Sequence, residues 1–504
     1  MTELETSDAT RLDHTRGALA HTVASSTWRR AFELRAADAT IAPAMRVGLA
    51  TAVVFVAASL LGYRELAGFA ALGALASAFG RYEPYPRLAG KLALVGVAVV
   101  GFVAFGGLLG AAALPSAVLI GVLSLAAGVA SVFMNAFQLT GPGPVILIFA
   151  ATGAAGYSTS SSDVLAVTAA AAVGVVVGWI AAMLPGVILP LGPARLAAAR
   201  ALVVVGSLEH RGAERVSAAR AALGRARDVL AASGHSRARR GHGHDLALLL
   251  DAADDAIDAW VVDGDAARIR EIARHERELR KVRRSGRLGG VGDRPSGRTE
   301  LPVPARLLQV ARANVRSATL RHTAIRVAAA SAAAGWLAWA CGLGHPLWAS
   351  MGAIAALQGL NFTHTVQRGI QRLIGNIGGA VIAAGLIAAS LGFWQAVVAV
   401  IVLQTAAELL VLVNYALTSL AVTPMALLLT GFTSPITPEA GMTRILDTLI
   451  GVVVGVIVAA VTVSRADRHH LVPDQPTRVT TANGPISSTV KRGSSNSALG
   501  NETL

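Results

Sequence analysis

The sequence predicts an all-α polytopic membrane protein with about 12 spans, in which two parallel six-helix units flank a cytoplasmic helical segment. The 504 residues are 54% hydrophobic and only 15% charged. No Asp, Glu, Lys or Arg occurs from Leu92 to Ser162, or strictly between Arg326 and Arg368. Helices of a soluble domain need a polar face, so uncharged runs of this length indicate helices that cross a bilayer.

The hydropathy pattern divides the chain into five parts. These are a cytoplasmic lead-in at 1–43, a first six-helix unit at 44–190, a basic helical domain at 191–324, a second six-helix unit at 325–465, and a disordered tail at 466–504. Within the basic domain, helical periodicity predicts helices at 194–232, 245–262, 265–284 and 303–321. The first unit has apolar segments at 44–62, 66–80, 91–111, 115–134, 142–157 and 164–184. The second has them at 325–343, 346–362, 373–391, 394–413, 416–432 and 444–463. Several approach the lower length limit for a span, which predicts tilted, kinked or broken helices.

Charge predicts the orientation. Basic connections such as THTVQRGIQR alternate with uncharged ones, and the 191–324 domain is basic. The positive-inside rule therefore places both termini and this domain in the cytoplasm. The first 42 residues carry charges throughout and contain no apolar stretch typical of a secretory signal, and Pro43 precedes the first span. Membrane-boundary arginines explain the net charge of +14 more simply than binding to nucleic acid does.

The two predicted units resemble each other in patches, which favours a parallel duplication over chance similarity between Ala/Gly-rich helices. The matching features are Arg46–Gly62 with Arg326–Gly342, RLAG at 87–90 with RLIG at 372–375, Pro144 with Pro424, and Gly174 and Gly178 with Gly451 and Gly455.

Glu408 is the only acidic residue between Glu300 and Glu439, and it lies inside a predicted span. A carboxylate in hydrocarbon is costly, so it should face a cavity, a partner or the bundle interior. It is our candidate for proton coupling. The alternative is an assembly role, hydrogen-bonded to neighbours such as Asn414 or paired with Arg368 or Arg372.

Arg368 and Arg372 are four residues apart, on one helix face at a predicted cytoplasmic boundary, where they could attract an anionic substrate. The alternative is a topogenic role in contact with lipid headgroups, and Arg81, Arg87 and Lys91 allow the same two interpretations. Further substrate-path candidates are Asn414, Tyr415, Thr423 and Pro424, because a proline beside polar groups in a span often marks a broken helix that lines a cavity. A packing kink would explain them equally well.

We find no pattern for catalysis or for a cofactor. Cys341 is the single cysteine, and no GxxxxGK[ST], nucleophile-elbow or zinc-protease motif occurs. The cluster His235, His242 and His244 lacks carboxylate or cysteine ligands and is typical of a solvated loop. We therefore expect no enzyme activity, cofactor or metal site.

Several segments of the second unit carry a family resemblance. HPLWASMGAIAALQ, TVQRGIQRLIGNIGGAV, AELLVLVNYALTSLAVTPMALLL and RILDTLIGVVVG resemble the fusaric acid resistance-like (FUSC-like) proteins of the aromatic acid exporter group. Their architecture corresponds to roughly residues 44–465 here. One departure is Gly375-Asn376, where the family often has Gly-Thr.

The resemblance implies a bacterial-type inner-membrane exporter of small organic acids, such as aromatic carboxylic acids, driven by the proton gradient. Its partners would be the lipid bilayer and the substrate, and a homo-oligomer or a membrane-fusion-type partner stays open. Plant malate channels are distantly similar, so a passive organic-anion channel is an alternative. A third is a non-transporting envelope protein whose basic domain binds a partner or anionic lipid.

Overall fold

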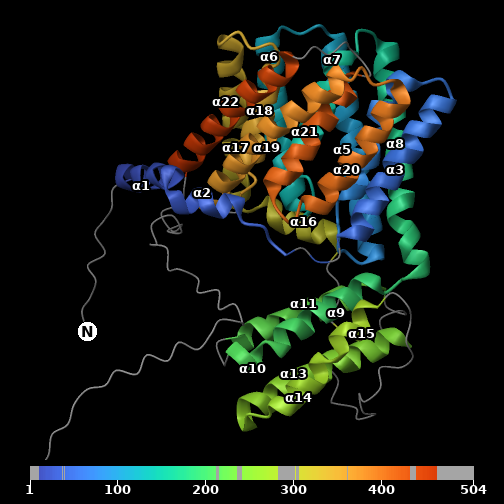
Figure 1. Cartoon of the computed structure of the whole chain (residues 1–504), viewed down its shortest axis with the longest axis vertical. Helices are drawn as coiled ribbons and strands as arrows, with labels where there is room; N and C mark the ends of the chain where they lie inside the picture. Colours follow the sequence, from blue (N-terminus) through green and yellow to red (C-terminus); the bar gives the residue numbers. More distant parts are fainter. Residues whose placement is uncertain are drawn as a thin grey trace, which may run out of the picture.

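The computed structural model describes residues 11–36, 38, 40–211, 215–234, 241–281, 301, 306–359, 361–431 and 439–462. All regular secondary structure in these residues is helical. Figure 1 shows a thick layer of long helices above a thinner layer formed by α9 to α15. Seven of the described helices are long and apolar enough to cross a membrane, and shorter apolar helices accompany them.

The helices of the thick layer follow the predicted segments. The first membrane half comprises α3 (Ile41–Leu60), α4 (Ala67–Ala74) with the 3-10 turn η2 (Leu75–Ala78), α5 (Tyr85–Ala111), α6 (Ser116–Ala136), α7 (Val145–Tyr157) and α8 (Ser161–Ile188). The second membrane half comprises α17 (Ala318–Ala340), α18 (Pro346–Ala356), α19 (Phe362–Ala388), α20 (Phe393–Leu410), α21 (Tyr415–Gly431) and α22 (Glu439–Val461). Helices α7 and α18, of 13 and 11 residues, are shorter than the roughly 20 residues of a full span.

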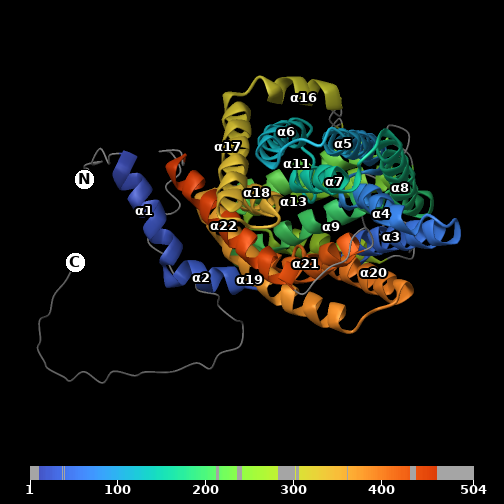
Figure 2. The same ribbon diagram turned by 90° about the horizontal axis from the view of Figure 1, so that it is seen from above.

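The same pairs of helices pack in both halves. In the first, α4 lies against α8, and α5 against α7 and α8; in the second, α18 lies against α22, and α19 against α21 and α22. The halves meet where α3 contacts α20 and where α6 contacts α17, as the view from above shows (Figure 2). At the second of these contacts the hydroxyls of Ser124 and Ser331 are 2.9 Å apart.

Small residues set the helix spacing in both halves. Gly174 and Gly178 of α8 press against the backbone of α4, at Ala70 and Ala74. The glycines that match them in sequence press against α18 in the same way: Gly451 faces Ala349, and Gly455 faces Ala353. Without a Cβ the helix backbones can approach closely, which is how helices associate in lipid. The glycine matches seen in the sequence therefore correspond to equivalent contacts in the two halves.

Large apolar side chains point outward from the membrane halves. Val97, Leu125 and Val187 are 74, 69 and 82% exposed. On a soluble protein such a surface would aggregate, whereas hydrocarbon solvates it. Inside, Phe55, Leu92, Leu123 and Leu147 are fully buried.

The thinner layer is a separate helical bundle with its own core, called here the appended domain. It contains α9 (Gly192–Gly206), α10 (Leu208–Arg211), α11 (Val216–Ala232), α13 (His242–Asp263), α14 (Ala266–Ala273) and α15 (His275–Arg280). Leu202, Leu223, Leu249 and Ile269 meet in its interior. The helix predicted at 194–232 is interrupted, because α9 ends at Gly206 and α11 begins only at Val216.

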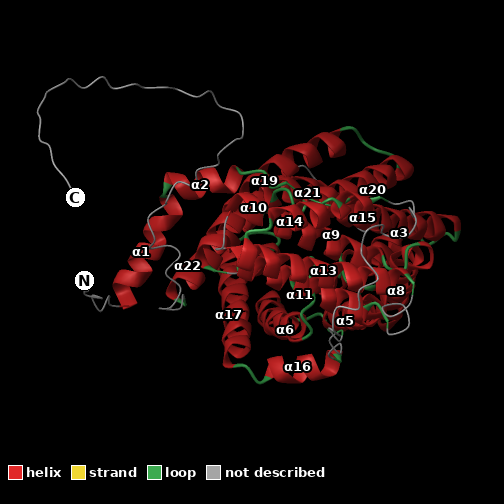
Figure 3. Cartoon of the chain, turned by 90° about the horizontal axis from the view of Figure 1, so that it is seen from below, coloured by secondary structure: helices red, strands yellow, loops and turns green. Residues whose placement is uncertain are grey.

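Two other predictions about this region need correction. His242 and His244 belong to the first turn of α13 rather than to a loop, and His235 lies outside the described residues. The helix predicted at 303–321 is split into α16 (Leu307–Val315) and the start of α17. Helix α16 packs against α6, where Asn314 Nδ2 donates to Ala136 O at 3.0 Å, so it contacts the first membrane half (Figure 3).

The N-terminal segment lies along the second membrane half. Helix α1 (Arg11–Val23) contacts α22, and α2 (Ser25–Phe32) contacts α19. Helix α3 begins at Ile41, so Pro43 occupies its first turn, where a proline is tolerated, instead of preceding the helix. The tail predicted to be disordered, 466–504, lies outside the described residues.

Candidate functional site

Arg368 and Arg372 lie inside α19 and not in a turn as predicted, because the helix begins at Phe362. Their four-residue spacing directs both toward Tyr415, at the start of α21. The Arg368 guanidinium carbon lies 4.0 Å from the centre of the Tyr415 ring, and Arg372 Nη1 donates to the Tyr415 hydroxyl at 3.1 Å. Arg368 also donates to Gln358 Oε1 at 3.1 Å and to Ala355 O at 3.3 Å. The structure thus brings together three of the predicted substrate-path residues.

One turn further along α19, a chain of hydrogen bonds crosses three helices. Asn376 Nδ2 donates to Thr448 Oγ1 of α22 at 2.6 Å, and Thr423 Oγ1 of α21 donates to Asn376 Oδ1 at 2.8 Å. Thr448 in turn donates to the carbonyl of Arg444 at 2.7 Å. All three side chains are buried. Hydrogen bonds of this kind hold membrane helices together, because lipid offers no alternative partner.

Pro424, the residue after Thr423, has a packing role in this state. A Cβ on Gly379 of α19 would lie 2.7 Å from Thr423 Cβ and 3.1 Å from Pro424 Cδ. The two helices therefore touch at this proline, inside α21. Of the two interpretations of the 414–424 run, the structure here shows close helix packing.

Arg444 and Asp447 of α22 are the most unusual polar residues in the membrane halves. They are 5 and 0% exposed. The Arg444 guanidinium carbon lies 4.4 Å from the centre of the Trp348 ring, which itself stacks on His345. Arg444 Nε and Nη1 and both carboxylate oxygens of Asp447 have no hydrogen-bond partner among the described residues. Buried polar atoms are normally paired, so unpaired ones in a membrane helix point to a functional site.

These groups form one continuous feature within the second membrane half. We call it the polar column and define it as Arg368, Arg372, Tyr415, Asn376, Thr423, Thr448, Asp447, Arg444 and Trp348. It is built by α18, α19, α21 and α22, which lie beside one another in Figure 2. It runs inside one half and not along the boundary between the two.

The sequence interpretation missed Arg444 and Asp447 because it used Arg444 as the end of a span. A usable signal was present. Residues 444, 448, 451 and 455 recur at helical spacing, and Gly451 and Gly455 already marked this face as the packing face. The same stripe therefore pointed Arg444 into the bundle.

Glu408 lies outside the polar column, and its partner is Arg81 of the first half instead of Arg368 or Arg372. Arg81 Nη2 lies 2.5 Å from Glu408 Oε2, and Arg81 Nη1 donates to Glu408 O at 3.0 Å. Nearby, Arg46 Nη2 donates to Phe79 O at 2.8 Å, at the end of η2. In the sequence, AAG at 126–128 matches AAE at 406–408, which pairs Gly128 with Glu408, and Gly128 lies against Ala324 of α17. Proton coupling by Glu408 stays a prediction.

Asn414 also lies outside the polar column. Its Nδ2 donates to Ala31 O and to Glu33 O, both at 3.0 Å, and its Oδ1 accepts from Ala416 N at 2.7 Å. It therefore caps the start of α21 and also binds the C-terminal end of α2.

Lys91, on α5, is buried and pairs with Glu83, and its Nζ also donates to Gln138 O at 3.1 Å. It thereby ties together two connections of the first half, at 79–84 and 137–144. Arg87 lies on the same helix and is partly exposed.

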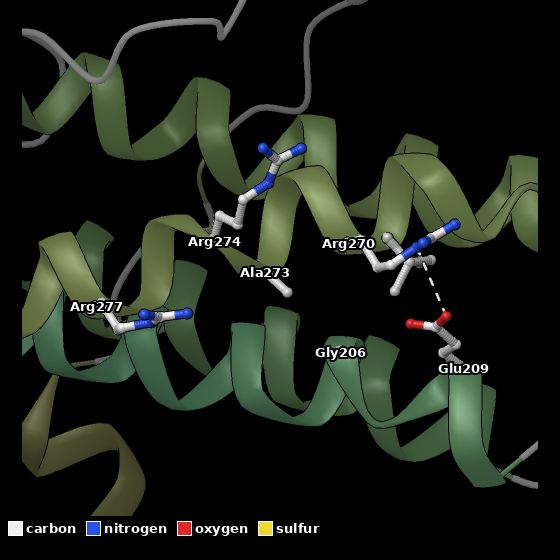
Figure 4. Close-up of a pocket in the computed structure, with 7 residues that line it drawn as sticks. Gly206, Glu209, Arg270, Ala273, Arg274 and Arg277 are labelled. Atoms are coloured by element: carbon white, nitrogen blue, oxygen red, sulfur yellow. Dashed lines mark ion pairs between the residues drawn. The ribbon is translucent and has the colours of Figure 1, made fainter.

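A surface cavity of about 180 Å³ lies in the appended domain, between α9 and α14 (Figure 4). Arg270, Arg274 and Arg277 line it with Gly206 and Glu209, and Arg270 Nε lies 3.6 Å from Glu209 Oε1. The Arg270 side chain is 63% exposed, so solvent screens its charge. No group of three metal-ligating side chains occurs among the described residues.

The long apolar helices, their exposed apolar surface and the polar residues buried between them define a multi-pass helical membrane protein. Residues 332–458 match the family model described as fusaric acid resistance protein-like. The matched residues begin within α17 and end within α22. The second membrane half therefore contains a FUSC-like domain, and the resemblance seen in the sequence is confirmed for this half. Comparison with curated proteins and with solved structures found no match.

Proposed function

We propose that the protein is a secondary transporter of the inner membrane that exports small organic acids, aromatic carboxylic acids foremost, with the proton gradient as its energy source. The single observation that supports this most is the buried polar column of the second half. The family match, which is to fusaric acid resistance-like proteins, agrees with a role in transport or resistance.

The composition of the column suits an organic anion. Arg368, Arg372 and Arg444 are cations that do not release their proton, and arginine's planar group binds carboxylates through two parallel hydrogen bonds. The rings of Tyr415 and Trp348 lie over the guanidinium groups of Arg368 and Arg444, so the cations have an aromatic environment that suits a substrate with a ring. Burying such groups in a membrane is costly, which argues for a functional reason.

The arrangement of the chain in the membrane is part of the proposal. The equivalent packing pairs in the two halves support two parallel units of about six spans each. The basic appended domain and the basic connections support a cytoplasmic location for that domain and for both termini. The lower end of the polar column, at Arg368, would then face the cytoplasm, where the substrate enters.

The test is efflux from proteoliposomes loaded with radiolabelled benzoate, with the membrane potential clamped and a pH gradient imposed. We expect efflux that depends on the pH gradient, and a reduction of about tenfold or more in Arg372→Gln, which removes one cation from the path. The matched control is Arg321→Gln, at an exposed position of α17 outside the column, which should transport normally. Equal flux in the two variants would contradict the proposal.

A passive anion channel is the second candidate, because a line of three cations, of which Arg444 is buried and Arg368 and Arg372 are partly buried, would also serve a pore. The same vesicles separate the two. Channel flux follows the membrane potential, about 2.3 kcal/mol per 100 mV for one charge, and ignores the pH gradient. Absence of any benzoate flux in folded, reconstituted protein would leave the non-transporting alternative.

A further inference from the structure

We propose that Arg444 and Asp447 form a carboxylate-binding site in which the anion and a proton bind together. The choice of ligand class rests on the proposed transport function. The site itself rests on two observations: these residues are buried with unpaired hydrogen-bonding atoms, and the first membrane half folds without any counterpart to them.

The first half serves as an internal comparison because its contacts give the equivalent positions. Gly174 and Gly451 occupy the same place on α8 and α22, against Ala70 and Ala349. For α5 and α19, Gly96 lies against Val175, and Gly369 lies against Val452, which occupies the matching place on α22. These pairs fix how the helices of one half superpose on those of the other.

At seven positions that these contacts make equivalent, the first half has an apolar residue. The pairs are Arg444 with Val167, Asp447 with Ala170, Thr448 with Ala171, Trp348 with Phe69, Arg368 with Val95, Arg372 with Val99, and Asn376 with Val103. For α5 and α19 this pairing differs from the sequence match of RLAG (87–90) with RLIG (372–375), which would place Arg87 opposite Arg372. The seven first-half residues all belong to one hydrophobic cluster or pack on it. The first half therefore has the same helix packing with apolar side chains at these seven positions. The fold does not require the polar groups, so their presence in the second half calls for another explanation.

The geometry at Arg444 is suited to a carboxylate. Trp348 covers one face of the guanidinium group and leaves in-plane donors, among them Nε and Nη1, without a partner. Asp447, one turn along α22, acts on Arg444 electrostatically, yet no hydrogen bond joins the two. Stacked arginine presents its N–H groups edge-on, the direction from which a carboxylate binds. The site is closed to solvent in this state, as an occluded transporter requires.

Anion and proton are linked because Arg444 compensates the charge of Asp447. A carboxylate ligand that pairs with Arg444 neutralises its positive charge. Asp447 is then a buried anion without a compensating cation. A proton from solvent then binds to an Asp447 carboxylate oxygen, and the neutral acid can donate a hydrogen bond to the bound carboxylate. Each occupant favours the other, so anion affinity should increase as pH falls.

Few other charged groups surround this pair. Arg444 acts on Asp447 from its own helix, Arg372 acts on Arg444 from α19, and His345 approaches Arg444 from the start of α18. The remaining titratable residues on helices that contact α22 are Arg368 and His364 on α19, Arg321, His322 and Arg326 on α17, and Arg11, Asp13, His14, Arg16 and His21 on α1.

The experiment measures equilibrium binding of radiolabelled benzoate to the purified full-length protein at pH values from about 5 to about 8. One linked proton predicts that affinity rises by up to about tenfold for each unit of falling pH. Asp447→Asn mimics the protonated acid, so its affinity should be independent of pH. Arg444→Gln should lose binding at all pH values. Acetate, which lacks the ring of benzoate and so buries less apolar surface on binding, should bind more weakly than benzoate.

A double variant separates binding from folding. Arg444→Val with Asp447→Ala installs the residues of the first half, and replacing a buried ion pair by apolar groups is often neutral or stabilising. We expect this variant to melt at or above the wild-type temperature and to lose benzoate binding. Unfolding of the double variant would overturn the site, as would pH-independent binding by the wild type or unchanged binding by Arg444→Gln. Proton-linked binding without flux in vesicles would instead refute transport and leave the site standing.

Discussion

Arg81 of the first membrane half and Glu408 of the second, 327 positions apart, are joined by an ion pair of 2.5 Å. The arginine also caps the end of α20 through the Glu408 carbonyl, which the helix itself leaves without a donor. Both side chains are about one-tenth exposed. This ion pair therefore joins the two membrane halves, on the side where α3 contacts α20.

Breaking this pair should destabilise the protein. Arg81→Gln leaves the Glu408 carboxylate buried without its cation, for which we expect a loss of about 3 kcal/mol in the free energy of unfolding. Thermal unfolding of the purified protein measures it. Arg87→Gln, a nearby arginine that is partly exposed, is the control and should change stability by less than about 0.5 kcal/mol.

Glu408→Gln distinguishes a role in joining the halves from proton coupling. If Glu408 only joins the halves, this variant should lose stability while transport by the surviving protein keeps its dependence on the pH gradient. Loss of that dependence in a protein of normal stability would support the coupling role.

Asn414 should control the order of the N-terminal segment. Its amide is the donor to two carbonyls, at Ala31 and Glu33, and Asn414→Ala removes both bonds. We expect faster hydrogen exchange and earlier proteolytic cleavage between α2 and α3, with little effect elsewhere. Thr323→Ala removes a hydroxyl that donates to the Thr319 carbonyl of its own helix, α17, and should leave this region protected. Equal protection in both variants would refute the anchoring role.

Helix spacing should depend on glycine at particular positions. A Cβ on Gly174 would collide with the carbonyl of Ala70, so Gly174→Ala must push α8 away from α4 and should cost about 1–3 kcal/mol. A Cβ added to Gly101 of α5 would have no other atom within 4 Å. Gly101→Ala should therefore be neutral or stabilise by up to about 1 kcal/mol, since alanine favours the helix. Melting temperatures that shift equally would contradict this difference.

Docking of the appended domain should weaken in acid. Burial alone would raise the pKa of Asp38, but hydrogen bonds and charges from Arg280 and Arg200 outweigh it, so the pKa lies below its ordinary value of 3.8. Arg280 Nη1 is 2.5 Å and Arg200 Nε 3.1 Å from the carboxylate. A lowered pKa stabilises the folded contact above pH 3.8, and this contribution is lost as pH falls through the folded-state value.

The measurement for Asp38 is the pH dependence of hydrogen exchange in α9 and α15, which carry the two arginines. Protection should decrease below about pH 4 in the wild type. Asp38→Asn should show low protection at all pH values. An acid dependence that persists in Asp38→Asn would assign it to another carboxylate.

Arg200 also connects the appended domain to the membrane half. Its guanidinium carbon lies 4.0 Å from the centre of the Tyr82 ring, and the Tyr82 hydroxyl donates to Asp38 O at 2.7 Å. Tyr82 directly follows Arg81 in the chain. The appended domain therefore contacts the turn that carries Arg81.

The positions of the helices could be predicted closely from the sequence, whereas several of their ends could not. The charges at Arg87, Arg368 and Arg444 were interpreted as lying at or beyond the ends of spans, yet α5, α19 and α22 continue through them. Hydropathy places the end of a segment at a charge, so it does not detect a helix that continues past one, as α19 does at Arg368 and α22 at Arg444. Two of these three arginines lie in the polar column.

The sequence by itself determined the class of protein, the order of its helices and the family of its second half. These follow from local properties, because a helix in lipid must be apolar over its own length. Only the tertiary structure decided that Glu408 meets Arg81, that Asn414 holds the N-terminal segment, and that Arg444 and Asp447 face the interior. Such pairings depend on which helix faces lie together across hundreds of residues. The apolar first half and the polar second half share one packing pattern, so packing alone does not choose between them.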